Sequence, residues 1–177
     1  MFNDLWLGRK LKKTNKDALR ERQFLNLESI QSILVLFDTS DYEEVDVFIE
    51  KLERMGKKIT VYAYKRNSDR YDYSETPYHI ITPKYSSVLF GHRLTAIAEE
   101  LKKNSFDLAI DLTVKRNISL EYLLAHADVL AKVGLKKNNQ SPYDLSIIFP
   151  SETPNESMKV SELSEQIFYY LYTIRSK

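Results

Sequence analysis

Apolar residues recur with two different periods along the chain, and this pattern predicts alternating strands and helices. Residues 30–37 form a short, β-branched apolar run that ends abruptly at polar residues, which is typical of a buried strand. Over residues 42–55 the apolar positions recur every three or four residues, and Gly56 follows where a helix commonly ends. Residues 59–64 predict the next strand. The three elements together predict a right-handed strand–helix–strand unit.

The same alternation continues to the end of the chain. Residues 91–103, 118–127 and 161–174 have helical spacing, and residues 106–112 predict a further strand. Three more short apolar runs follow, over residues 79–81, 131–134 and 143–149. We expect the last of these three to form the longest strand among them. This order predicts an α/β fold, a Rossmann-like three-layer sandwich with a mostly parallel sheet of about five strands.

The start of the chain differs in charge from the rest. Residues 1–24 contain seven basic and three acidic side chains, a net charge of +4, whereas the whole chain has a net charge of +1. We expect a basic amphipathic helix over residues 1–27, followed by the α/β domain over residues 28–177. Its candidate partner surface consists of Trp6, Arg9, Lys10, Lys12, Lys13 and Lys16. The helix either packs on the domain through its apolar side or binds a protein partner, with RNA or an anionic membrane surface as weaker alternatives.

Composition excludes several kinds of chemistry. The 177 residues include no cysteine, which removes disulfides, thiolate catalysis and cysteine-based metal sites. The three histidines, His79, His92 and His126, stand in separate segments, so we expect no metal site. No apolar run approaches the roughly 20 residues that span a bilayer, and the start of the chain lacks a signal peptide pattern. These features predict a cytoplasmic protein without a transmembrane segment.

The candidate ligand site lies at the ends of predicted strands, because open parallel sheets bind ligands at their carboxyl edge. The polar residues that follow two such strands are Asp38, Thr39, Ser40, Asp111, Thr113, Lys115 and Arg116. Helix capping alone accounts for the first three, whereas the last four have the chemistry to hold an anion. No glycine follows the first strand, so a dinucleotide or P-loop site is not expected and no cofactor is predicted. No nucleophile motif is present, which favours a role without catalysis.

Two resemblances add to this interpretation. Four stretches, ILVLFDTSDYEEVDVFIEKLERMGKKITVYAY, FDLAIDLTVKRNISLEYLLAHADVLAKVGL, YDLSIIFP and YYLYTIRS, resemble an uncharacterised family of small Bacteroidetes proteins, from about Leu19 onward. That resemblance implies a Rossmann-like domain in a bacterial cytoplasm, with no established activity. Residues 106–112, 119–127 and 131–134 also resemble the N-terminal half of lipopolysaccharide heptosyltransferases. The half of those enzymes that binds the nucleotide sugar has no counterpart here.

Three functions follow as hypotheses. The first is a non-catalytic Rossmann-like module that acts through a protein partner. The second is a ligand-binding or enzyme domain related to the acceptor half of a sugar transferase. The third is association with RNA or a membrane surface through the basic N-terminal helix.

Overall fold

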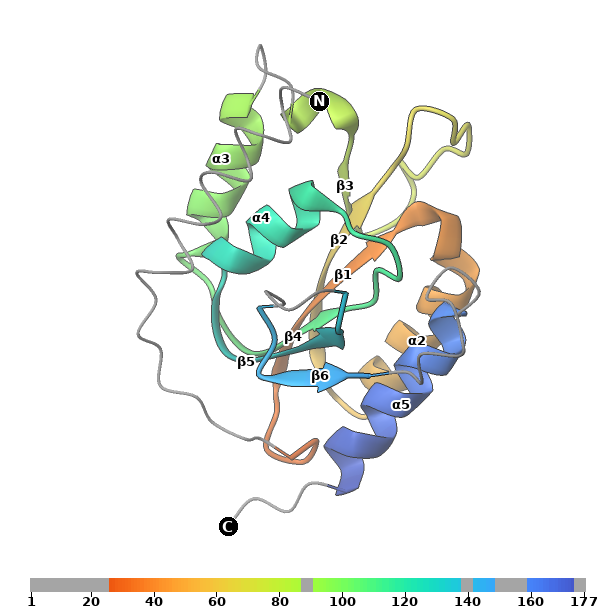
Figure 1. The fold of residues 1–177 in the computed structure, drawn as a ribbon, viewed down its shortest axis with the longest axis vertical. Helices are drawn as coiled ribbons and strands as arrows, with labels where there is room; N and C mark the ends of the chain where they lie inside the picture. The colour runs from red at the N-terminus through yellow and green to blue at the C-terminus, as the bar shows by residue number, and fades with distance from the viewer. Residues whose placement is uncertain (1–25, 87–90, 138–141, 149–158, 174–177) are drawn as a thin grey trace.

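The computed structural model describes residues 26–86, 91–137, 142–148 and 159–173 (Figure 1). Its strands are β1 (Ser32–Asp38), β2 (Lys58–Tyr64), β3 (His79–Ile81), β4 (Ser105–Asp111), β5 (Asp128–Leu135) and β6 (Leu145–Ile147). Its helices are α2 (Tyr42–Arg54), α3 (Gly91–Leu101), α4 (Ile118–His126) and α5 (Val160–Thr173), with short 3-10 turns η1 (Thr39–Asp41) and η2 (Pro83–Ser86). The closing helix predicted from the sequence is therefore α5.

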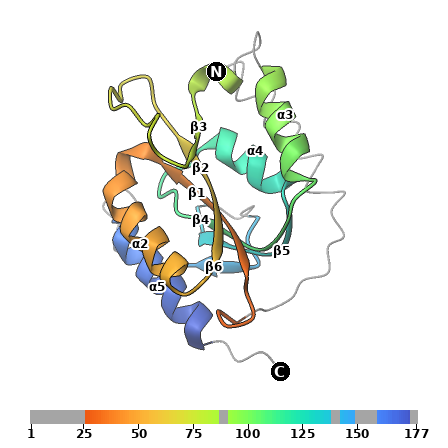
Figure 2. The ribbon, with the colours of Figure 1, turned by 180° about the vertical axis from the view of Figure 1, so that it is seen from behind.

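The strands form one six-stranded sheet in the order β3-β2-β1-β4-β5-β6, and all five neighbouring pairs are parallel. Helices α2 and α5 cover one face, and α3 and α4 cover the other (Figures 1 and 2). The strand order reverses between β1 and β4. On one side of this point β1 is followed by β2 and β3, and on the other side β4 is followed by β5 and β6. This arrangement confirms the Rossmann-like three-layer sandwich, with six strands where the sequence indicated about five.

Both faces of the central strand β1 are buried. Ile33, Val35 and Phe37 pack in the core under α2 and α5, whereas Leu34 and Leu36 pack under α3 and α4. All five side chains are 0% exposed. A strand covered on both faces needs no polar alternation, which explains its continuous apolar sequence.

The predicted lengths of the last two strands were wrong. Strand β5 has eight residues rather than the short run expected, and β6 has three rather than seven. Lys132 interrupts the apolar run of β5 in the sequence, yet its side chain is buried. Its burial is compensated because Nζ donates to the carbonyl oxygen of Leu124, in the last turn of α4, at 2.6 Å. A lysine that satisfies a helix C-terminal carbonyl fits inside a buried strand. Among the described residues, strand β6 lies at the edge of the sheet and pairs with the end of β5.

Gly56 ends α2 in the left-handed conformation, with a φ of 77°. Its N–H donates to the carbonyl oxygen of Glu53 at 2.8 Å, and a Cβ at this position would meet no atom within 4 Å. We therefore expect Gly56→Ala to lower the free energy of unfolding by about 1 kcal/mol, from backbone strain alone. Urea denaturation measures this loss. Glu53→Ala, on the exposed side of α2, is the control and should change stability by only a few tenths, as about ±0.5 kcal/mol is usual for surface changes. An equal loss in both variants would contradict a conformational cause.

The predicted basic helix lies almost entirely outside the described residues, as do Trp6, Arg9, Lys10, Lys12, Lys13 and Lys16. The division at residue 27 therefore stays a prediction. Within the described part, Leu27 and Ile30 are buried in the core under α2 and α5. No helix among the described residues is long and apolar enough to cross a membrane.

Candidate functional site at the carboxyl edge of β1 and β4

The sheet topology brings Asp38 and Asp111 to one edge and one face. Leu36 of β1 pairs with Asp111 of β4, and Asp38 lies two residues beyond Leu36. Neighbouring strands are about 4.8 Å apart and two residues rise about 6.6 Å, so the two aspartates are close neighbours. Leu36 packs under α3 and α4, and the twofold period of a strand therefore directs both aspartates to that face.

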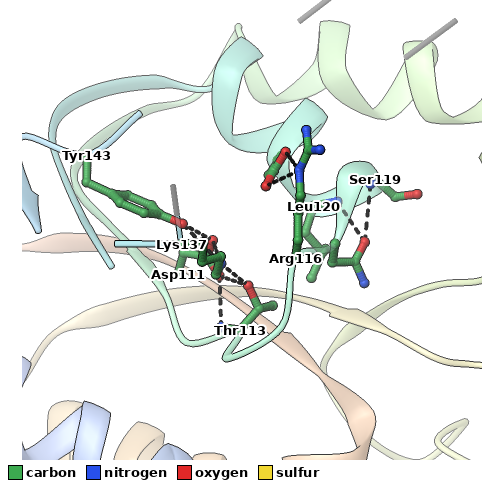
Figure 3. Close-up of polar contacts among 9 residues, drawn as sticks. Asp111, Thr113, Arg116, Ser119, Leu120, Lys137 and Tyr143 are labelled. Atoms are coloured by element: carbon green, nitrogen blue, oxygen red, sulfur yellow. Dashed lines mark hydrogen bonds and ion pairs between the residues drawn. The ribbon is translucent and has the colours of Figure 1, made fainter. Parts of the chain in front are cut away.

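Asp111 is the centre of a buried polar group, the Asp111 cluster, which also contains Thr113, Lys137 and Tyr143 (Figure 3). The Lys137 Nζ lies 2.9 Å from Asp111 Oδ2, and the Tyr143 hydroxyl donates to the same oxygen at 2.5 Å. Thr113 donates to Asp111 Oδ1 from its backbone N–H at 2.8 Å and from its hydroxyl at 2.5 Å. Lys137 also donates to the Thr113 hydroxyl. Asp111 is 1% exposed, and these contacts satisfy both of its oxygens.

The charges of the Asp111 cluster balance. Burial by itself raises the pKa of Asp111, but the adjacent Lys137 ammonium and the hydrogen bonds outweigh burial and hold this pKa below its usual value. Burial and the Asp111 carboxylate both raise the pKa of Tyr143, so its hydroxyl keeps its proton. The cluster thus contains one buried ion pair and a protonated phenol. Its contacts connect the end of β4 to Lys137 and Tyr143.

Gly134 allows Tyr143 to reach this position. It pairs with Asp111 across β4 and β5, and an added Cβ would lie 2.7 Å from Cε1 of the Tyr143 ring and 3.1 Å from the Asp111 carbonyl oxygen. No side chain larger than hydrogen fits there unless the ring moves. The glycine in β5 is therefore part of the construction of the cluster.

The loop between β4 and α4 is fixed at both ends. Asn117 caps α4, its Oδ1 accepting from the N–H groups of Ser119 at 3.2 Å and Leu120 at 3.3 Å (Figure 3). Arg116 Nε lies 3.1 Å from both carboxylate oxygens of Glu121, whose pKa is raised because its burial outweighs the attraction of Arg116. The Arg116 side chain is 57% exposed and Lys115 is also exposed. The loop therefore carries two exposed cations at the carboxyl edge, of which Arg116 is paired with Glu121.

The end of β1 carries a second ion pair. Asp38 caps η1 by accepting from the backbone N–H of Ser40 at 3.4 Å and from its hydroxyl at 3.2 Å, which is the capping role that the sequence indicated. Arg66, in the loop after β2, donates from Nε to Asp38 Oδ2 at 3.0 Å. Asp38 has a 9% exposed side chain and Arg66 a 53% exposed one, so the arginine covers the aspartate from the solvent side.

Thr39 belongs to a different contact, with the loop that follows β2. Its hydroxyl donates to Asp69 Oδ2 at 2.5 Å, and the Tyr73 hydroxyl donates to the same oxygen at 2.9 Å. Burial raises the pKa of Asp69, but the hydrogen bonds from Thr39, Tyr71 and Tyr73 outweigh it and lower that pKa. The Thr39 side chain therefore anchors the tyrosine-rich loop to η1, the turn immediately before α2.

The seven predicted site residues thus fall into two groups at one edge. The first group, at the end of β1, is Asp38, Thr39 and Ser40, and the second, after β4, is Asp111, Thr113, Lys115 and Arg116. Sequence reasoning selected none of Arg66, Lys137 and Tyr143 as site residues, although residues 65–67 lie in a loop after a predicted strand. Position after a strand end was the available signal for Arg66, whereas Lys137 was hidden because β5 was predicted to end at residue 134. Among the described residues no group of three or more His, Cys, Asp or Glu side chains is arranged to hold a metal ion.

The parallel sheet, its strand order and the polar edge at β1 and β4 define a Rossmann-like α/β protein. The chain belongs to a protein family of unknown function, DUF6913, whose profile matches residues 4–174. No curated protein matches this chain in sequence. The resemblance to an uncharacterised family is thereby confirmed.

A solved structure, E. coli heptosyltransferase WaaC with ADP, is similar in fold, with a TM-score of 0.50 and 14% sequence identity. The match covers 77% of this chain and 47% of that chain. This chain therefore spans about half of the heptosyltransferase. At this level of identity the likeness shows the fold alone.

Proposed function

We propose that this chain is a ligand-binding domain for a small anion, such as a phosphate ester, at the carboxyl edge between β1 and β4. The observation that carries the proposal is the reversal of strand order between these two strands, the place where open α/β sheets bind ligands. Asp38, Arg66 and the loop that carries Lys115 and Arg116 all lie at this edge.

The side chains at this edge have different proposed roles, according to their chemistry. The exposed cations Arg66, Lys115 and Arg116 suit a phosphate group, since guanidinium and ammonium donors make charge-assisted hydrogen bonds to it. Asp38 holds the Arg66 guanidinium at this edge through their ion pair. The Asp111 cluster positions the β4–α4 loop and does not contact the ligand. Because the paired Asp111 and the protonated Tyr143 supply no base, the proposed role is binding without catalysis.

Lys115→Ala and Arg66→Ala should each weaken binding of a phosphorylated ligand about tenfold, the equivalent of about 1.4 kcal/mol. Suitable probes are glucose 6-phosphate and ADP, the nucleotide with which the similar heptosyltransferase was solved. Thermal shift followed by calorimetry measures the effect, because a ligand at 100 times its dissociation constant adds about 2.7 kcal/mol of stability.

The matched control for this experiment is Lys103→Ala. Lys103 is also exposed, but it lies between α3 and β4, at the opposite edge of the sheet. Its removal should leave binding unchanged. The proposal would be refuted if neither probe raised the melting temperature of the unmodified chain. It would also be refuted if Lys115→Ala bound the probe as tightly as the unmodified chain.

A second candidate function is a non-catalytic module that acts through a protein partner. Three tyrosines exposed on α5, Tyr169, Tyr170 and Tyr172, favour it, because tyrosine is enriched in protein interfaces. Under this candidate the Lys115→Ala and Arg66→Ala variants behave like the unmodified chain. Association of residues 1–27 with RNA or a membrane surface stays a prediction from the sequence.

A further inference from the structure

The outer side of α2 and α5 is an acidic surface. The two helices lie side by side on one face of the sheet (Figures 1 and 2). Together they contain seven acidic and two basic residues, a net charge of −5. The acidic residues are Glu43, Glu44, Asp46, Glu50, Glu53, Glu162 and Glu165, and all are exposed except Asp46, which is half-buried and accepts from the Tyr78 hydroxyl. We call this surface the α2/α5 face.

The α2/α5 face also carries large exposed apolar and aromatic side chains. Tyr169 is 61% exposed, Tyr172 is 70% exposed, and Val47 of α2 is 70% exposed. The Tyr172 ring stacks on Phe168 with a centroid distance of 6.4 Å, and Lys51 Nζ of α2 lies 3.4 Å from the Phe168 centroid. Aromatic rings held in place by such contacts lose little conformational freedom on binding, so they form a favourable docking surface.

The chain itself delivers its N-terminal segment to this face. The Leu27 N–H donates to the carbonyl oxygen of Leu171 at 3.0 Å, in the last turn of α5. Leu27 is 1% exposed and Ile30 is 0% exposed, so the chain is firmly anchored there. Residues 1–25 are therefore joined to the domain beside the last turn of α5.

Those 25 residues are complementary to the α2/α5 face in charge and length. Residues 1–24 have a net charge of +4, and their sequence has the spacing of an amphipathic helix with Leu7, Leu11 and Ala18 near one side. Helix α5 has 14 residues, which corresponds to about 21 Å, and a helix of equal length needs little more than half of the N-terminal segment.

We propose that residues 1–25 bind to the α2/α5 face of the same chain. Their lysines and arginines pair with the acidic side chains of α2 and α5, and their apolar side covers the tyrosines. Binding of residues 1–25 to their own domain then competes with any protein that binds residues 1–25 or the α2/α5 face. This docking is independent of the ligand site, which lies at the edge of the sheet.

The absence of native cysteine makes a distance measurement on the full chain direct, because spin labels attach only at introduced cysteines. One pair is Lys12→Cys with Gln166→Cys, on the exposed side of α5. The matched control pair is Lys12→Cys with Ala96→Cys, exposed on α3 at the other face of the sheet. Packed helices lie about 8–10 Å apart, so the first pair should give a narrow pulsed-EPR distribution below about 30 Å. The control pair should give longer distances.

A charge and aromatic variant tests the cause of docking. Glu165→Lys with Tyr172→Ala should reduce the narrow population at least about twofold, since it removes one attraction and one contact surface. Glu100→Lys, exposed on α3, should leave it unchanged. Binding of ADP or glucose 6-phosphate, if present, should be the same in all these variants.

Three results would overturn the inference. A broad distribution for the Gln166 pair would mean that the segment does not dock on α5. Narrow short distances for the Ala96 pair would place it on α3. Loss of the short distance after dilution with unlabelled chain would assign the contact to residues 1–25 of a second copy.

Discussion

The Lys137→Met variant is expected to lose about 3–5 kcal/mol of unfolding free energy at pH 7, the usual consequence of removing one partner from a buried ion pair. The Lys137 side chain is 7% exposed and that of Asp111 is 1% exposed, so water cannot replace the lost ammonium. Methionine occupies a similar volume, and the loss therefore reflects the uncompensated carboxylate rather than a cavity. Urea denaturation at several pH values measures it.

The pH dependence of this loss distinguishes electrostatics from packing. In the unmodified chain the lowered pKa of Asp111 gives stability that is present above the unfolded pKa of about 3.9 and is lost as the pH falls through the folded value. Without Lys137, burial is less opposed and the pKa of Asp111 rises above the unfolded value. The variant is then relatively stabilised below about pH 4 and loses this stability as the pH rises through its new pKa. The difference between the two proteins should therefore shrink on acidification.

Two further variants complete the test. Lys136→Met changes the exposed neighbour and should alter stability little. Asp111→Asn combined with Lys137→Met removes both charges and should recover much of the loss, because a neutral amide is cheaper to bury than a charge. A loss that is independent of pH, or one that the double change does not reduce, would show that the pair is not the cause.

The sequence predicted the fold better than the site, and the reason is the range of the interactions involved. The strand–helix–strand unit over residues 30–64 depends on local periodicity, a polar strand end and Gly56, all of which can be read within a few residues. The Asp111 cluster depends on the pairing of β4 with β5, which brings Lys137 from 26 residues away and Tyr143 from 32 residues away. No spacing along the chain contains that information.

The candidate residues show the same division. Asp38 and Asp111 were found because each follows an apolar run, and that position is visible in the sequence. Their partners Arg66 and Lys137 were not predicted, since an exposed and a buried cation look alike without the strand order. The side chains of β5 were misleading for a related reason, because Lys132 is buried through a contact with Leu124, eight residues earlier in α4, that no strand or helix period indicates.

The Gly134→Ala variant should lower the free energy of unfolding by about 1–3 kcal/mol, the usual cost of overpacking a filled interior position. The added Cβ would approach Cε1 of Tyr143 to 2.7 Å and its Cζ to 2.8 Å, so the ring has to move and the Tyr143–Asp111 hydrogen bond lengthens or breaks. Chemical denaturation measures the loss. Gly56→Ala serves as the comparison, since its cost arises from the backbone alone.

A double-mutant cycle identifies the clash as the cause. In a Tyr143→Ala background the ring is absent, and Gly134→Ala should then cost less than half of what it costs in the unmodified chain. The remaining cost reflects the 3.1 Å approach to the Asp111 carbonyl oxygen, which no change at residue 143 relieves. An equal cost in both backgrounds would mean that β5 requires glycine for its own backbone. In that case Tyr143 occupies its position as a consequence of the strand and not as the reason for Gly134.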